Sequence, residues 1–254
     1  MDRCLFDFAL RMGDTTLILS QQLSAWCGHG PILEEDLALA NTALDLLGQA
    51  RLWLTLAAEA EGAGRDEDQL AYLRDAHEFR NALLVERPNG SYADTMTRQF
   101  FFDAWHYFLL ERLAASSEPR VAAIAEKAVK EAAYHARRSA DIVVRLGDGT
   151  AESHARMQAA VDDLWPYTGE LFADDANDIQ AAQRGIACPL AELRGPWIAQ
   201  VGAVLDEATL ACPAEDLARH AAYRGGRQGR HTEALGPLLA EMQFLQRAYP
   251  GAIW

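Results

Sequence analysis

The sequence predicts an all-α protein. Alanine and leucine dominate its 254 residues, and apolar side chains recur at the three- and four-residue spacing of a helix. Alternation of polar and apolar residues, which is typical of strands, is scarce. No internal repeat of 20–50 residues is found, so the chain is not expected to be a solenoid.

Two long helices are predicted in the N-terminal third. The first covers about residues 5–26 and ends before Gly28. The second begins with three acidic residues, which favour a helix N-terminus, and covers about residues 34–60. One of its faces is predicted to stay apolar, through Leu37, Ala40, Leu44, Leu47 and Leu54. A shorter helical connection follows at about residues 66–85.

Two further long helices follow this connection. Ser91 and Asp94 have the spacing of a capping box, which predicts a helix that starts there and ends near residue 113. Pro119 fits the first turn of a fourth helix, which ends near Gly147. Two long helices, a connection and two more long helices form the order of a ferritin-like four-helix bundle.

Additional helices are predicted after the fourth long helix. Thr150 caps a fifth helix that is interrupted near Pro166, and further segments fit residues 173–184, 190–210 (with Pro196 inside) and 233–248. We therefore expect a single domain over residues 1–254, with a core bundle at about 5–146 and a helical extension at about 150–254.

Charge and composition narrow the range of partners. The net charge of −14 repels phosphate backbones and anionic lipid, so nucleic acid and membrane surfaces are poor partners. No apolar stretch approaches the 18 or so residues of a membrane span, and the N-terminus lacks a signal-peptide pattern. The cysteines are widely spaced, which favours reduced thiols in a cytoplasmic protein: Cys4, Cys27, Cys188 and Cys212.

A ferritin-like bundle raises the question of a di-iron centre. Such a centre takes a glutamate from each of two helices and a Glu-x-x-His pair from each of the other two. Residues i and i+3 share one helix face, so the pair can reach one metal. None of the seven histidines has a glutamate three positions earlier, and only His106 has a carboxylate there, Asp103. The sequence therefore lacks the ligands of a di-iron centre.

Partial matches to these ligand pairs occur on two helices. Asp45 is followed at i+3 by Gly48, where the imidazole should be. On the fourth helix Glu131 lies near His135, but the residue three before His135 is Ala132. On the residues alone, the more ordinary interpretation is that these are unrelated polar side chains in helix interfaces.

Several longer segments carry a resemblance to a known family. The chain resembles, essentially end to end, the C-subunit family of bacterial phenylacetyl-CoA epoxidases, which take part in phenylacetate catabolism. Its most specific segments are Leu37–Asn41, Leu44–Arg51, Asp103–His106, Lys130–His135 and His231–Gln243.

The resemblance implies a structural role. In that family the A and C subunits are similar ferritin-like proteins that pair, and the di-iron centre and the binding site for the CoA thioester lie in the A subunit. For this chain the resemblance implies a non-catalytic subunit without catalytic residues, metal or cofactor, which pairs with and stabilises the A subunit. Further subunits are expected as partners, and a homodimer of the isolated chain stays open.

The A-type ligand pattern can be carried onto this chain by position. Asp45 and Gly48 would replace the first Glu-x-x-His, Asp103 would replace the third-helix carboxylate, and Ala132 and His135 the second pair. The first-helix glutamate would fall near Thr15 or Thr16. The resemblance thus implies a vestigial pocket, made of Asp45, Gly48, Asp103, His106, Glu131, Ala132 and His135.

Two other functions stay open. One is an active di-iron oxygenase with an unusual ligand set that draws on Glu131 and His106. The other is a helical module that binds a CoA ester. A glycine-rich basic loop with Arg224, Arg227 and Arg230 could contact CoA phosphates or a partner's acidic residues. The simpler interpretation of this loop is a solvated connection.

Overall fold

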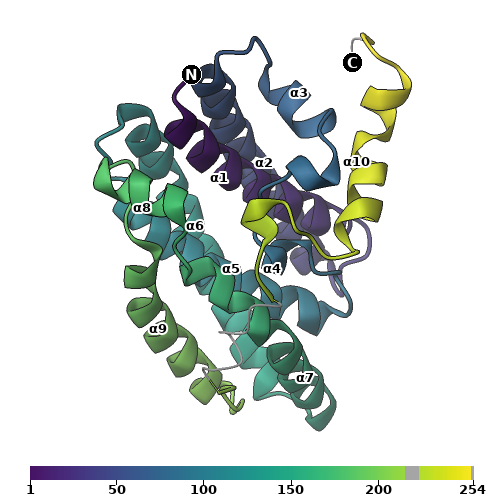
Figure 1. Ribbon diagram of the computed structural model, residues 1–254. Helices are drawn as coiled ribbons and strands as arrows, with labels where there is room; N and C mark the ends of the chain where they lie inside the picture. Colours follow the sequence, from purple (N-terminus) through teal and green to yellow (C-terminus); the bar gives the residue numbers. More distant parts are fainter. Residues whose placement is uncertain (215–222, 253–254) are drawn as a thin grey trace. The chain divides into compact units, whose positions relative to one another are not determined.

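The computed structural model describes residues 1–214 and 223–252, and within them it contains helices and no strand (Figure 1). The all-α class and the order of long helices typical of a ferritin-like bundle are confirmed. The α-helices are α1 (Arg3–Ser24), α2 (Leu33–Glu61), α3 (Glu67–Tyr72), α4 (Leu83–Glu86), α5 (Tyr92–Leu113), α6 (Pro119–Gly147), α7 (Ala151–Thr168), α8 (Ala176–Gln183), α9 (Arg194–Glu207) and α10 (Leu235–Ala248).

The four long helices begin and end close to their predicted bounds, for local reasons. The backbone N–H of Ser91 donates to the Asp94 carboxylate at 2.7 Å, which closes the predicted capping box of α5. Pro119 occupies the first turn of α6, where its missing N–H costs nothing. Gly62 ends α2 in the left-handed conformation (φ 67°), which glycine adopts without strain.

Two prolines act differently from the prediction. The α7 helix continues through Pro166 and ends two residues later, so the predicted interruption is wrong. The proline lies in the last turn, where little helix remains to be broken. Pro196 lies in the first turn of α9, a position that tolerates proline. The predicted helix at 190–210 is therefore a short 3-10 turn (Leu190–Leu193) followed by α9.

The chain divides into two compact units. One contains Met1–Arg87 together with Gly225–Trp254, and the other contains Pro88–Arg224. The C-terminal helix α10 thus belongs with the N-terminal helices, although its place in the sequence predicted that it is part of an extension after residue 150. The expectation of a single domain over 1–254 stays a prediction.

The first unit is built on the antiparallel pair α1 and α2. The Asp2 N–H donates to the Ala60 carbonyl at 2.9 Å, which joins the start of α1 to the end of α2. Between them Gly13 permits close approach, since a Cβ there would lie 2.6 Å from the Leu54 side chain. Helix α10 packs on α3, where the Gln243 side chain donates to the Ala71 carbonyl at 3.1 Å.

The second unit is built on the antiparallel pair α5 and α6, with α7 and α9 packed against α5. Aromatic side chains hold these helices together. The Trp197 indole donates to the Phe101 carbonyl at 3.0 Å, and both rings pack against Trp165. The Trp165 indole donates to the Ala214 carbonyl at 3.2 Å, so burying these three rings leaves neither indole N–H without an acceptor.

Two other sequence expectations concern location. All four cysteines are free; Cys4 and Cys188 are buried, and Cys27 and Cys212 are exposed. Among residues 1–214 and 223–252, no helix has both the length and the apolar composition needed to cross a bilayer. The cytoplasmic location stays a prediction.

Candidate functional site

Buried polar side chains gather between α5 and α6. Gln99, Asp103 and His106 follow one face of α5 at helical spacing, and His135 and Ser139 lie four residues apart on α6. Each of the five is almost completely buried. We call this group the α5–α6 polar cluster. Such a group in an apolar interior is costly unless its members bond to one another.

The carboxylate of Asp103 is the centre of this cluster. The Gln99 amide donates to Asp103 Oδ1 at 2.6 Å, and the Ser139 hydroxyl donates to the His135 carbonyl at 2.9 Å. Burial raises the pKa of Asp103 to about 6, although the charge of His135 and the polar groups of Ser139 and Gln99 oppose the rise. The side chain is therefore held close to its protonation midpoint near neutral pH.

His106 is the cluster's neutral member. Burial, together with a smaller effect of the nearby His135, lowers its pKa to about 3. The centre of its ring lies 4.8 Å from the ring centre of Phe102 and 6.3 Å from that of Trp105, to which it is stacked. Among described residues, His106 Nε2 and Asp103 Oδ2 have no hydrogen-bond partner. The interior thus holds an uncharged imidazole that packs as an aromatic ring.

The residues of this helix pair do not fit a di-iron centre. Ala132 is buried at the position where His135 would need a carboxylate partner, and Glu131 is only half-buried. Nowhere in residues 1–214 and 223–252 are three or more His, Cys, Asp or Glu side chains grouped so that they could hold a metal ion. One carboxylate and two imidazoles are too few for two iron ions, because affinity depends on ligand number and geometry together.

The raised pKa of Asp103 gives a first testable prediction. The pKa of Asp103 is about 6 in the folded chain and 3.8 in the unfolded chain. The folded state therefore becomes less stable as the pH rises from about 4 to about 6 and the carboxyl loses its proton. Asp103→Asn should therefore stabilise the chain by up to about 3 kcal/mol at pH 7.5 and have little effect near pH 4. Urea unfolding at both pH values measures this, with the half-buried Asp45→Asn as control. A loss of stability at pH 7.5 would contradict it.

Two residues of the predicted pocket lie on α2. Asp45 is half-buried, and Gly48 is exposed with open space beyond it. Gly48 therefore lies on the surface of the helix. Leu46 and Gln49, one position further along than Asp45 and Gly48, are both buried. Gln49 was missed, although Thr42 and Trp53 share its helix face and are also buried.

Helix α1 carries one buried acidic residue, Asp14, and its carboxylate already pairs with an arginine. Arg74 forms a buried ion pair with Asp14, through Nη1 at 2.9 Å from Oδ2, and the Arg80 N–H donates to the same oxygen at 2.8 Å. At the positions expected for a first-helix glutamate, the Thr16 hydroxyl donates to the Met12 carbonyl, and the Thr15 hydroxyl accepts the Ala82 N–H. This helix offers no unused carboxylate.

The similarity of the whole chain to known proteins identifies its family. A family model described as "Phenylacetic acid catabolic protein" matches residues 1–254. The chain belongs to this family. The C subunit of the 1,2-phenylacetyl-CoA epoxidase of Escherichia coli (strain K12) is 54% identical to it over 248 residues, which cover 97% of this chain and 98% of that protein. The resemblance found in the sequence segments is confirmed.

In this member of the phenylacetic acid catabolic family, the basic loop is docked and not solvated. Gly226 lies so close to the preceding connection that a Cβ would be 2.2 Å from the Asn81 carbonyl oxygen. Gly229 (φ 80°) approaches the His77 carbonyl in the same way. Among the predicted contact residues, Arg227 is buried, Arg224 is half-buried and Arg230 is exposed. The interpretation as a solvated connection is wrong, and Arg227 is not displayed to a ligand.

Just after this loop lies a buried ion pair that sequence reasoning missed. His231 Nδ1 lies 2.8 Å from Glu86 Oε2, and His231 Nε2 lies 3.0 Å from the Phe79 carbonyl. Glu86 also accepts the Thr232 N–H at 2.6 Å. Burial acts to lower the pKa of His231, but the hydrogen bond and charge of Glu86 outweigh it and raise that pKa. The pair anchors the segment that leads into α10.

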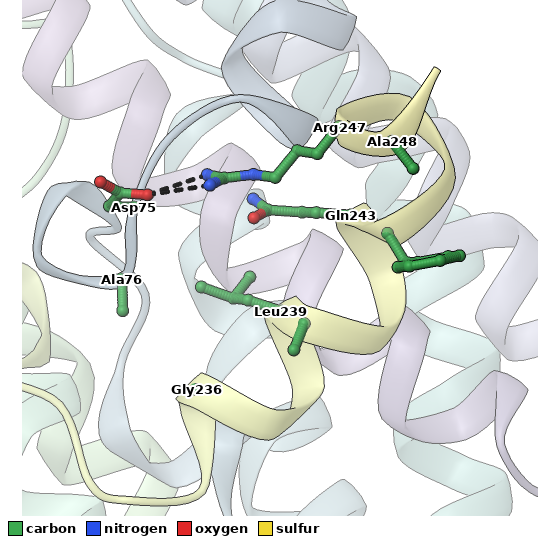
Figure 2. Close-up of a pocket in the computed structure, with 9 residues that line it drawn as sticks. Asp75, Ala76, Gly236, Leu239, Gln243, Arg247 and Ala248 are labelled. Carbon is green, nitrogen blue, oxygen red and sulfur yellow. Dashed lines mark hydrogen bonds and ion pairs between the residues drawn. The ribbon is translucent and has the colours of Figure 1, made fainter. Parts of the chain in front are cut away.

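A pocket of about 550 Å³ lies beside α10 (Figure 2). Leu239, Gln243 and Arg247 reach it from the helix, and Asp75 and Ala76 from the facing connection. Both terminal nitrogens of Arg247 lie 3.0 Å from Asp75 Oδ1, and Arg247 also donates to backbone carbonyls. Since this guanidinium is already neutralised, the pocket is poorly suited to the phosphates of a CoA ester.

Proposed function

We propose that the chain is the non-catalytic C subunit of a phenylacetyl-CoA epoxidase in phenylacetate catabolism, where it pairs with and stabilises the di-iron A subunit. The 54% identity to the C subunit of such an epoxidase supports membership of this kind of assembly. The observation that carries the pairing role is an exposed apolar face on α2.

This α2 leucine face consists of Leu33, Leu37, Leu44 and Leu47, at helical spacing. Their exposed fractions are 70, 55, 65 and 39%, whereas Leu54, predicted on the same face, is buried. Exposed apolar patches of this kind mark protein interfaces. Gly48 lies among them with nothing in front of it, so a partner helix could approach the backbone closely.

The absence of catalysis in this subunit is supported by its donor set. The α5–α6 polar cluster offers Asp103, His106 and His135, and one of these, His106, is held neutral in an aromatic environment. The alternative of an active oxygenase would need Glu131 to join His106, but Glu131 is half-buried and outside the cluster. A rigid partner that covers the active subunit's outer helices can hold its ligands in place.

The test is reconstitution with the A subunit. We expect the two proteins to co-purify, with about two irons in the A subunit and none in this chain. The A subunit alone should lose activity or stability, and addition of this chain should restore it. About two irons in this chain when it is purified alone would favour the oxygenase alternative. Normal turnover by the A subunit alone would contradict the supporting role.

A further inference from the structure

Helix α6 carries a concentration of positive charge that the proposed function does not use. It holds six Lys or Arg and three Asp or Glu residues, so its net charge is +3, although the whole chain carries −14. The cations are not scattered around the helix. Lys127, Lys130, Arg137 and Arg145 share one exposed face.

This face can be defined from the helix geometry. The four cations, with Tyr134 and Asp141, recur every three or four residues, which places them on one side of an α-helix. At 1.5 Å per residue the face is about 27 Å long. We call it the α6 basic stripe. A surface of this length corresponds to a protein partner and exceeds the reach of a single small anion.

The cations of the stripe are not neutralised within the part of the chain that the structure describes. Lys127, Lys130, Arg137 and Arg145 form no ion pair with a described residue. Each of these cations has an acidic residue four positions away on the helix (Glu126, Glu131 or Asp141), but none forms an ion pair with it. The stripe, which contains four cations and Asp141, therefore presents a net charge of +3 to its surroundings.

An exposed aromatic side chain lies in the middle of the stripe. Tyr134 is 54% exposed and is flanked by Lys130 and Arg137 at i−4 and i+3. Tyrosine and arginine are enriched at protein interfaces, where tyrosine gives contact area at low entropy cost. A tyrosine among unpaired cations is typical of a contact surface, and this observation is independent of the charge count.

The shape and charge of the stripe indicate which kind of molecule binds to it. An exposed helix face is convex, whereas sites for small molecules such as CoA are concave. The rest of the chain is strongly negative and repels nucleic acid. We propose that the α6 basic stripe docks the acidic surface of a second protein of the epoxidase assembly, distinct from the subunit on the α2 leucine face. This inference rests on the proposed function.

Electrostatic docking of this kind has a measurable signature. Charge complementarity raises the association rate and makes it fall with salt, because screening shortens the range of the attraction. The α2 leucine face should instead give an association that depends little on salt, since apolar burial is not screened. Salt dependence therefore separates the two surfaces.

The test uses the full chain and the other purified subunits of the assembly, immobilised one at a time. Lys130→Glu/Arg137→Glu should slow association with one acidic subunit by about tenfold or more at low salt. Asp141→Lys should speed it. The matched control is Arg3→Glu/Arg156→Glu, which makes the same charge change at exposed residues of other helices. An equal loss in this control, or no loss in the stripe variant, would overturn the inference.

The outcomes separate this inference from the proposed function. The stripe variant should still co-purify with the A subunit; if it loses the A subunit instead, the stripe is not a separate docking surface. If the wild-type chain binds an acidic subunit through the stripe but never the A subunit, the proposed pairing fails while the stripe is upheld. If the isolated wild-type chain binds CoA and the stripe variant does not, the stripe is a site for a phosphate ligand, and the proposal of a protein partner is wrong.

Discussion

Leu37→Asp/Leu44→Asp is expected to abolish stable pairing with the A subunit while leaving the isolated chain folded. Both side chains are more than half exposed, so their replacement removes little packing within the chain. In the complex each leucine would be buried, and full burial of a leucine contributes roughly 1.5–3 kcal/mol. Because part of each side chain is already buried, the two together should contribute about 2–4 kcal/mol.

A loss of about 2–4 kcal/mol corresponds to a dissociation constant about 30- to 1000-fold higher. The desolvation of two carboxylates at the interface would add to it. The measurement is co-purification followed by titration of the A subunit against the variant. The thermal midpoint of the variant alone shows that the fold is intact.

The matched control for this variant is Leu73→Asp/Leu245→Asp. These leucines are exposed to a similar degree, 53 and 48%, but lie outside α2. We expect this control to pair normally. If it lost pairing as fully as the α2 variant, the effect would come from added charge and not from the α2 leucine face.

Glu86→Gln is expected to destabilise the chain by about 1–3 kcal/mol near pH 6, the usual cost of removing a charged partner from buried hydrogen bonds. The substitution removes the charge that faces His231, so the imidazolium loses its counter-charge and releases its proton more readily. It also weakens the hydrogen bonds to the Thr232 N–H and the Asn81 amide. Urea unfolding gives the free-energy change.

The pH dependence of this loss follows from the pKa of His231. That pKa is raised in the folded state, so the pair's contribution is fully present below the unfolded value of 6.5 and is lost as pH rises through the folded value. The deficit of Glu86→Gln should therefore shrink as pH rises above 6.5. Hydrogen exchange should show the opening first in α10, which the pair anchors.

The control for this pair is His77→Gln, at an exposed histidine in the same unit. It should leave the free energy of unfolding unchanged within about 0.5 kcal/mol. A deficit of Glu86→Gln that stayed constant from about pH 6 to well above the unfolded pKa of 6.5 would show that His231 is neutral in the folded chain, contrary to the expected ion pair.

Much of the secondary structure could be predicted because its signals are local. The capping box at Ser91 and Asp94, the proline at 119 and the glycine at 62 each set a helix end by their own chemistry. Pro166 misled the prediction because the cost of a proline depends on how much helix follows it. Only the structure gives that length.

The candidate site could be predicted only in part. Asp103 and His135 were identified from residue type and spacing, and both are buried in the α5–α6 polar cluster. Gly48 was predicted to line the pocket, but the buried face of α2 includes the next residue, Gln49. The identity of a single residue does not reveal which side of a helix is buried. The ion pair of Glu86 with His231 joins residues 145 positions apart, and no local pattern marks such a pair.

By itself the sequence determined the helical class, the family and the shortage of di-iron ligands, because periodicity, long matched segments and ligand spacing are properties of neighbours along the chain. The tertiary structure decided which apolar and charged faces stay uncovered. The leucines of α2 could have been core, and the cations of α6 could have been paired, until packing showed otherwise. Exposure is set by contacts between distant segments, which the order of residues along one helix does not contain.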